Sequence, residues 1–192
     1  MQKTLFAALK RYPVFSVKDI ANVLDKAAGY AYLVAFRLKK SGVINEVEKG
    51  KYSFEEDPFI IASWIVWPSY ITGWAALNYY KLTEQLAFTI HVATTRKRKK
   101  KSIVFGKTRI EFIKIKKSLF FGFERIIFHG MEIFIAEKEK AIVDAVGAKK
   151  MSLAEVAQIV KENKRKISVK KLFSYAKNVR GLNKKLRSLL RD

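Results

Sequence analysis

The sequence predicts an α+β protein in two parts: a helical unit that ends in a hairpin over residues 1–56, and a small antiparallel sheet with a helical end over residues 57–192. Two observations lead to this expectation. Apolar residues recur at helical spacing before residue 40 and after residue 152, whereas the segment between them holds β-branched and aromatic runs separated by turn residues. The chain has 192 residues, which is enough to bury two small cores.

The first 40 residues predict three helices. The first ends at Pro13, because a proline inside a helix removes a backbone hydrogen bond and clashes with the preceding turn. Ser16 is a suitable N-cap for a second helix over residues 17–24. A short turn leads to a third helix over residues 29–40, which has one apolar stripe.

A hairpin is expected to follow the third helix. Gly42 suits the left-handed end of that helix. Two short strands over residues 43–47 and 51–54 flank a turn in which Gly50 supplies the positive φ that such hairpins need. The order helix, helix, turn, helix, hairpin is that of a winged helix-turn-helix. In that fold the last helix lies in the major groove of DNA, and the hairpin, or wing, reaches the neighbouring backbone.

The residues expected to contact DNA lie on the outward side of the third helix and on the wing. Arginine can bond a base edge with two hydrogen bonds, whereas lysines are suited to phosphates. An alternative is that the helix serves a protein contact and that Tyr32 or Phe36 packs on the second unit. The candidate DNA contacts are Lys26, Tyr30, Tyr32, Arg37 and Lys40 on or just before the helix, and Lys49 and Lys51 on the wing.

The chain has a formal net charge of +22, from 39 basic and 17 acidic residues. The excess lies in three blocks: residues 1–54 are net +6, residues 96–150 net +10 and residues 151–192 net +9, around a segment of net −3 at 55–95. Such an imbalance is costly in self-repulsion unless a polyanion neutralises it, and therefore favours nucleic-acid binding. A lysine-rich thermophilic surface is the alternative, but it normally carries matching glutamates.

A run of six cations separates two of the strands expected in the second unit, 88–94 and 102–105. Consecutive charges are not expected to be buried, so the run is expected to form an exposed loop. It is either a solvated loop or an arm that neutralises DNA phosphates without regard to sequence. The run consists of Arg96, Lys97, Arg98, Lys99, Lys100 and Lys101.

The remainder of the second unit is expected to mix strands with short helices. Residues 58–80 are uncharged and long enough to span a bilayer, but Pro68 and several polar residues argue against a span. We expect a buried strand at 64–67 and a helix at 73–80 capped by Ser69 or Thr72. Further strands are expected at 109–115, 123–128 and 131–135. Further helices are expected at 137–146, 168–178 and 183–190, and another is expected to begin with a capping box formed by Ser152 and Glu155.

The sequence does not favour an enzyme, a cofactor or a bound metal. Cysteine is absent and the histidines are only His91 and His129, so thiolate or histidine-rich metal sites are not expected. Glu111 with Lys114, and the run 137–140, loosely match the acid–lysine pattern of metal-dependent nucleases, but no aspartate on a neighbouring strand completes the set. A nuclease is the less favoured alternative. The lack of cysteine and of an apolar N-terminal signal predicts a cytoplasmic protein.

Several segments resemble the AbiEi antitoxin family, whose members are also described as transcriptional regulators of viral defence systems. The likeness runs from about residue 3 to beyond residue 180. The segments that carry it are YITGWAALNYY at 70–80, VATT at 92–95, LFFGFE at 119–124 and IAEKEKAIVD at 135–144.

This resemblance implies a DNA-binding repressor that is the antitoxin of an AbiE-type (type IV) toxin–antitoxin system. Its winged helix would bind inverted repeats in its own promoter, as a monomer or a dimer. Its second unit would counter a nucleotidyltransferase-like toxin without a stable complex, and the matched Glu139, Lys140 and Asp144 are candidates for that role. The alternative is a general winged-helix regulator or architectural DNA-binding protein. One departure is that Glu46 and Glu48 stand on the wing, where basic residues would suit DNA.

Overall fold

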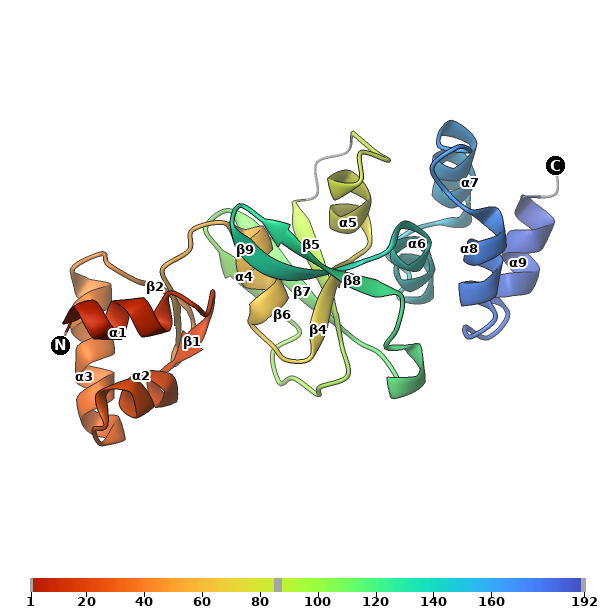
Figure 1. Cartoon of the computed structure of the whole chain (residues 1–192). Helices are drawn as coiled ribbons and strands as arrows, with labels where there is room; N and C mark the ends of the chain where they lie inside the picture. Colours follow the sequence, from red (N-terminus) through yellow and green to blue (C-terminus); the bar gives the residue numbers. More distant parts are fainter. Residues whose placement is uncertain (1, 85–87, 191–192) are drawn as a thin grey trace.

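The computed structural model describes residues 2–84 and 88–190 and has an α+β fold, as predicted. The N-terminal unit lies at one end of the molecule, a six-stranded sheet lies in the middle and the last three helices lie at the other end (Figure 1). The N-terminal unit consists of α1 (Gln2–Leu9), β1 (Phe15–Ser16), α2 (Val17–Leu24), α3 (Ala28–Lys40), β2 (Asn45–Glu48) and β3 (Lys51–Ser53).

Local signals place the helices of the N-terminal unit. Ser16 begins α2 with a capping box, in which its hydroxyl accepts from the Asp19 amide at 3.3 Å and the Asp19 carboxylate accepts from the Ser16 amide at 2.7 Å. Asp25 then takes a left-handed conformation and turns the chain into α3. The predicted N-cap at Ser16 and the positive φ at Gly42 and Gly50 are confirmed.

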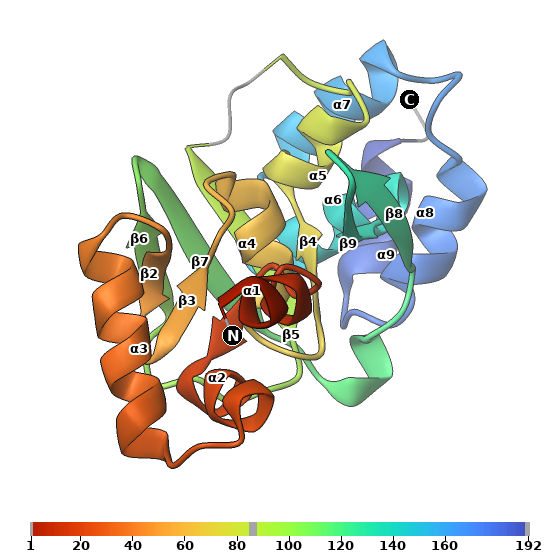
Figure 2. The ribbon, with the colours of Figure 1, turned by 60° about the vertical axis from the view of Figure 1, so that its left-hand side comes forward.

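The three short strands of this unit form an antiparallel sheet in the order β1-β3-β2. The sheet and the three helices enclose a core that includes Leu9, Phe15, Ile20, Ala35 and Ile44. All five side chains are almost completely inaccessible to solvent. The three helices surround this core, and α3 lies at the edge of the molecule (Figure 2).

The six-stranded sheet of the second unit has the order β6-β7-β5-β4-β9-β8. The prediction of an antiparallel sheet is wrong in part, because β5 is parallel to β7 and β4 is parallel to β9. After β5 the chain skips one strand position to the sheet edge, and the β6–β7 hairpin then returns β7 to the vacant place beside β5. The strands are β4 (Ser69–Thr72), β5 (Thr89–Thr94), β6 (Ser102–Phe105), β7 (Thr108–Lys114), β8 (Phe123–Phe128) and β9 (Met131–Ala136).

The uncharged segment differs from the prediction at its start. The strand expected at 64–67 is wrong: residues Pro58–Trp64 form helix α4, and the strand β4 begins at Ser69. Asp57 caps α4 by accepting from the Phe59 amide at 2.8 Å, and Pro58 occupies the first turn, where a missing amide costs nothing. The Asp57 cap and Pro58 are local signals of a helix start. The apolar residues that follow them recur at neither helical nor strand spacing, so they do not identify a helix.

The helix expected at 73–80 is confirmed as α5 (Trp74–Tyr79), although its N-cap is Gly73. Ser69 and Thr72 are instead buried in β4, so neither caps the helix. Within residues 2–84 and 88–190, no helix is long and apolar enough to cross a bilayer.

The C-terminal helices belong to the same core as the sheet. Ser152 and Glu155 form the predicted capping box, with the Glu155 carboxylate accepting from the Ser152 amide at 2.6 Å. Leu172 and Leu186 are fully buried in the large core, together with Ile71 of the sheet. These helices are α6 (Lys138–Gly147), α7 (Leu153–Glu162), α8 (Val169–Ala176) and α9 (Leu182–Leu189), and a short 3-10 turn, η1 (Lys117–Leu119), precedes β8.

Candidate nucleic-acid interface

Helix α3 exposes a broad face that combines aromatic and basic side chains. Ala31, Ala35 and Leu38 point into the core of the N-terminal unit, so the opposite side of the helix faces solvent. Tyr32 is 58% exposed and Phe36 is 54% exposed. The predicted contacts Lys26, Tyr30, Tyr32, Arg37 and Lys40 are all exposed, on α3 or just before it.

The acidic residues of the hairpin β2–β3 are both paired within the molecule. Lys39 of α3 forms an ion pair with Glu46 of β2, and this hydrogen bond raises the pKa of Lys39. Glu48 accepts from Arg98 at 2.5 Å and lies 3.0 Å from the ammonium of Lys51. Neighbouring cations therefore neutralise both Glu46 and Glu48, the two carboxylates that depart from the basic character expected of a wing.

The pairs around Glu48 also attach the hairpin to the second unit. Burial alone would raise the pKa of Glu48, but hydrogen bonds from Arg98 and Lys51 lower it, so the carboxylate stays charged. The Lys51 ammonium donates to the Ile65 carbonyl at 2.5 Å, and Val47 packs in the core of the second unit. Of the two lysines predicted to contact DNA from the hairpin, Lys49 is exposed, whereas the ammonium of Lys51 is engaged within the molecule.

The cationic loop between β5 and β6 lies beside this hairpin. Arg96, Lys97, Lys99, Lys100 and Lys101 are exposed, as predicted. The expectation fails for Arg98, whose side chain is only 13% exposed. Its guanidinium lies 4.0 Å from the centre of the Phe112 ring, and the ring together with Glu48 compensates the burial of the charge.

An exposed tryptophan adjoins this loop. Trp67 is 59% exposed, and the Arg96 side chain donates to its carbonyl at 3.2 Å. Its ring stacks on Trp64 at 6.4 Å and meets Phe134 edge-on at 5.0 Å. The aromatic cluster is therefore joined to the base of the loop through the backbone of Trp67.

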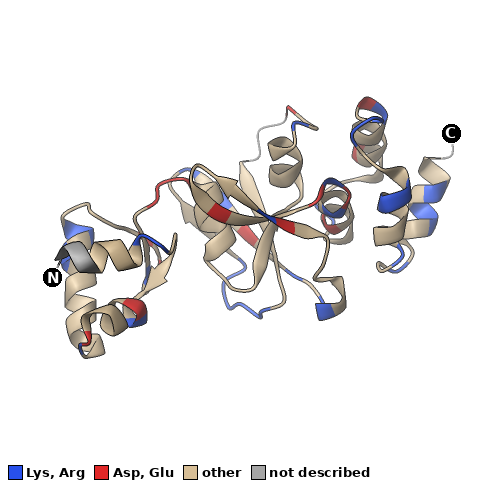
Figure 3. Ribbon diagram, in the orientation of Figure 1, with Lys and Arg blue, Asp and Glu red and all other residues tan. Residues whose placement is uncertain are grey.

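The other basic region of the chain lies far from α3. Figure 3 shows lysines and arginines on α8 and α9, at the end of the molecule opposite the N-terminal unit, as well as along the β5–β6 loop. Lys171 is paired with Glu137 at 3.0 Å. The exposed basic residues of α8, α9 and the segment between them are Lys170, Lys177, Arg180, Lys184, Lys185 and Arg187.

The three residues matched to an antitoxin role are buried. Lys140 and Asp144 form an ion pair at 2.5 Å with side-chain exposures of 1% and 4%. The Asp144 carboxylate also accepts from Tyr70 at 2.8 Å and from Thr72 at 3.2 Å. Glu139 is buried and accepts from the amide that begins α8. These contacts join α6 to β4 and α8, and they leave the three side chains out of reach of another macromolecule in this conformation.

The carboxylates that loosely match a nuclease pattern are engaged separately. Glu111 accepts from Lys150 at 2.8 Å and lies 3.6 Å from His91, whereas Glu137 accepts from Tyr175 at 2.5 Å. Burial lowers the pKa of His91, which favours its neutral form. Among the described residues, no three histidine, aspartate or glutamate side chains converge on a point where they could hold a metal ion.

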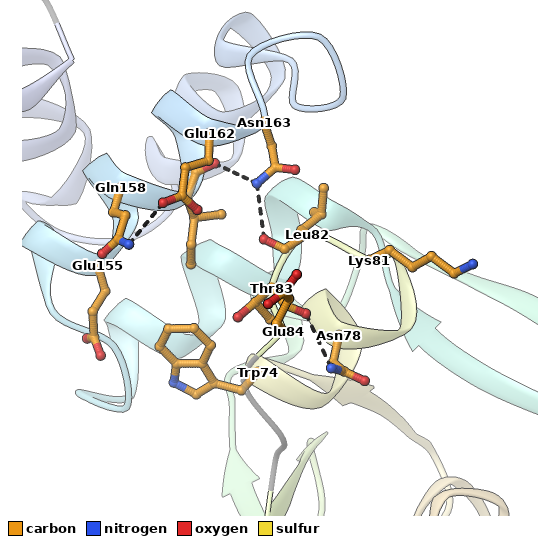
Figure 4. Close-up of a pocket in the computed structure, with 11 residues that line it drawn as sticks. Trp74, Asn78, Lys81, Leu82, Thr83, Glu84, Glu155, Gln158, Glu162 and Asn163 are labelled. Atoms are coloured by element: carbon orange, nitrogen blue, oxygen red, sulfur yellow. Dashed lines mark hydrogen bonds between the residues drawn. The ribbon is translucent and has the colours of Figure 1, made fainter.

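A pocket of about 1030 Å³ lies between α5 and α7 (Figure 4). Some of its polar side chains bond one another or nearby backbone: Gln158 donates to Glu162 at 2.9 Å, and Asn163 donates to the carbonyl of Leu82 at 3.0 Å. Glu155, which also lines it, is engaged in the capping box of α7. This arrangement has no nucleophile paired with a base among the side chains drawn.

Sequence reasoning did not find the pairing of Glu48 with Arg98 or the exposed position of Trp67 beside the loop. The two partners of the pair are 50 residues apart, and no local pattern links them. Comparison with known proteins adds no assignment, since no protein-family model and no curated protein sequence matches this chain.

Proposed function

We propose that the N-terminal unit is a winged helix that binds duplex DNA through α3, with the β5–β6 loop as an additional phosphate-binding arm. The observation that carries the proposal is the pairing of Arg98 with Glu48, at 2.5 Å. It fixes a loop of five exposed cations beside the hairpin of the unit that presents α3. The order of helices and strands, with a three-stranded antiparallel sheet, supports the winged-helix assignment.

The exposed side chains suggest a division of roles. Arg37 is exposed and suited to make two hydrogen bonds to a guanine edge in the major groove, and Tyr30, Tyr32 and Lys40 are also exposed on α3. Lys26, Lys49 and the exposed cations of the loop are suited to phosphates. Lys51 and Arg98 are left out of this surface, because their charged groups are engaged within the molecule.

We extend the proposal to a repressor that acts as the antitoxin of an AbiE-type system, on the resemblance of the second unit to that family. Glu139, Lys140 and Asp144 would then shape the second unit and not contact a toxin, because all three are buried. A neighbouring gene for a nucleotidyltransferase-like toxin, silenced by this chain in coexpression, would support the extension. Its absence would favour a general winged-helix regulator.

The DNA proposal is tested by fluorescence anisotropy with a labelled duplex from upstream of the chain's own gene and with a shuffled duplex. Arg37→Ala should weaken binding to the upstream duplex about tenfold and to the shuffled duplex much less, since one bidentate base contact contributes about 1–3 kcal/mol of discrimination. The matched control is Lys161→Ala, which removes one exposed cation from α7. Equal effects of the two substitutions on the upstream duplex would contradict base reading by Arg37.

A further inference from the structure

A pocket of about 470 Å³ lies between the β5–β6 loop, strand β7 and the end of α6. Its volume is in the usual range for small-molecule sites, about 300–1,000 Å³. Apolar side chains, among them Ile113 and Ala148, form part of its lining, and Glu111 is its one acidic residue among those described. The cations that line it are Arg96, Lys97, Arg98, Lys101, Lys114 and Lys150.

We call this cavity the Arg98 pocket. Its lining carries far more positive than negative charge. Glu111 is engaged with Lys150 at 2.8 Å, and Arg98 is paired with Glu48 outside the pocket. Within the described part of the chain, Lys97, Lys101 and Lys114 form no ion pair with an acidic side chain. Like charges that converge on a concave surface repel one another and attract an anion.

One hydrogen-bond donor in the lining has no partner. The Nε atom of Arg98 is buried and is not hydrogen-bonded, although the other end of the guanidinium binds Glu48. A buried donor without an acceptor is costly, and phosphate oxygens are the acceptors that guanidinium groups bind best. The lining of the pocket therefore includes cations without an acidic partner and a guanidinium with one unused donor, although this Nε atom is not itself exposed to the pocket.

The recessed position of Arg98 favours a small ligand over a DNA backbone. Its side chain is only 13% exposed, whereas Lys99 and Lys100 of the same loop are exposed and do not line the pocket. The convex surface of a duplex can reach these two lysines but not a recessed guanidinium. Ile113 and Ala148 are half-buried and offer apolar contact to a sugar or base.

We propose that the Arg98 pocket binds a nucleoside polyphosphate, with its phosphates on Arg98 and the surrounding lysines and its nucleoside against Ile113 and Ala148. Because Arg98 also holds Glu48 of the hairpin, a bound phosphate places a second anion on the same guanidinium and weakens its attraction for that carboxylate. The ligand would thus loosen the hairpin and change the affinity for DNA. This second consequence rests on the proposed DNA-binding function, whereas the pocket itself does not.

Isothermal titration calorimetry of the full chain without DNA tests the site directly. ATP or GTP should bind with saturable heat, AMP at least about tenfold more weakly and adenosine not measurably, since each lost phosphate removes charge-assisted hydrogen bonds. Tripolyphosphate, which lacks a nucleoside, should bind more weakly than whichever of ATP and GTP binds more tightly. Absence of saturable binding by both triphosphates at millimolar concentration would overturn the proposal, and equal binding of tripolyphosphate would overturn the nucleoside contact.

Substitutions locate the binding. Arg98→Lys keeps the charge but removes the fork of donors, and it should weaken triphosphate binding about tenfold. Lys101→Ala with Lys114→Ala should do the same while leaving the pair of Arg98 with Glu48 in place. The matched control, Lys99→Ala with Lys100→Ala, removes two charges from the same loop outside the pocket and should change affinity less than about threefold. A greater loss in the control than in both pocket variants would place the ligand elsewhere.

The regulatory consequence has its own measurement. DNA affinity should change when the pocket is saturated, and by linkage DNA should change nucleotide affinity by the same factor. Arg98→Lys should reduce both effects. If the chain binds no DNA, the calorimetry still tests the pocket, and if no nucleotide binds, the DNA-binding result stands on its own.

Discussion

At the scale of single residues, Lys140 and Asp144 show how a charged pair is accommodated inside the second unit. Burial raises the pKa of Asp144, while Lys140 and the hydroxyls of Tyr70 and Thr72 act in the opposite direction. The Lys140 ammonium also lies 4.8 Å from the centre of the Phe121 ring. Each charge therefore depends on its partner and neighbours, because water does not reach either of them.

We predict that Asp144→Ala lowers the free energy of unfolding by about 3–5 kcal/mol, since it leaves the Lys140 charge buried without a partner. Urea denaturation followed by circular dichroism measures the loss. The double variant Lys140→Met with Asp144→Leu removes both charges and should recover most of it. A loss below about 1 kcal/mol for the single variant would show that the pair is not buried as described.

The sequence predicts exposure well where charge is isolated and poorly where it is paired. Five cations of the loop are exposed as expected, because water is their best environment. Arg98 differs only because Glu48 and Phe112, both distant in sequence, come to lie beside it. The same holds for Lys140 and Asp144, whose spacing fits one face of a helix but does not indicate whether that face is buried.

At the scale of elements, helix starts and hairpin turns are predicted well because their signals lie within a few residues. The N-cap at Ser16, the capping box at Ser152 and the turn at Gly50 occur as expected. The uncharged segment is harder, since a segment buried on all sides has no polar face to reveal its period. Helix α4 was therefore missed, although Asp57 and Pro58 mark its beginning.

The attachment of the hairpin β2–β3 to the second unit gives a prediction at this scale. Glu48→Gln and Arg98→Gln, made singly and together, should show a coupling of about 1–2 kcal/mol in urea denaturation, since both side chains are largely buried. The folded pKa of Glu48 lies below its ordinary value of 4.5. The stabilisation is therefore complete above about pH 4.5 and is lost as the pH falls through the lower folded value. Additive effects of the two substitutions would contradict the contact.

At the scale of the whole molecule, the strand order and the docking of the two units lie beyond sequence patterns. Parallel pairing of β5 with β7 depends on the strand position that the chain skips beside β5, which no residue near either strand encodes. The sequence shows which segments carry the excess positive charge, but it does not show where these segments lie in the folded molecule. The loop comes to lie beside the hairpin, whereas the basic α8 and α9 lie at the opposite end of the molecule (Figure 1).

From this arrangement we propose that the β5–β6 loop, and not the C-terminal helices, binds DNA together with α3. The most direct test is the salt dependence of binding to a duplex of about 20 base pairs. The logarithm of the association constant falls with the logarithm of salt concentration by about 0.9 for each phosphate neutralised. Lys99→Ala with Lys100→Ala should make this slope shallower by about 2, whereas Lys184→Ala with Lys185→Ala should leave it nearly unchanged. Equal slopes for both variants, or a shallower slope only for the C-terminal pair, would contradict the claim.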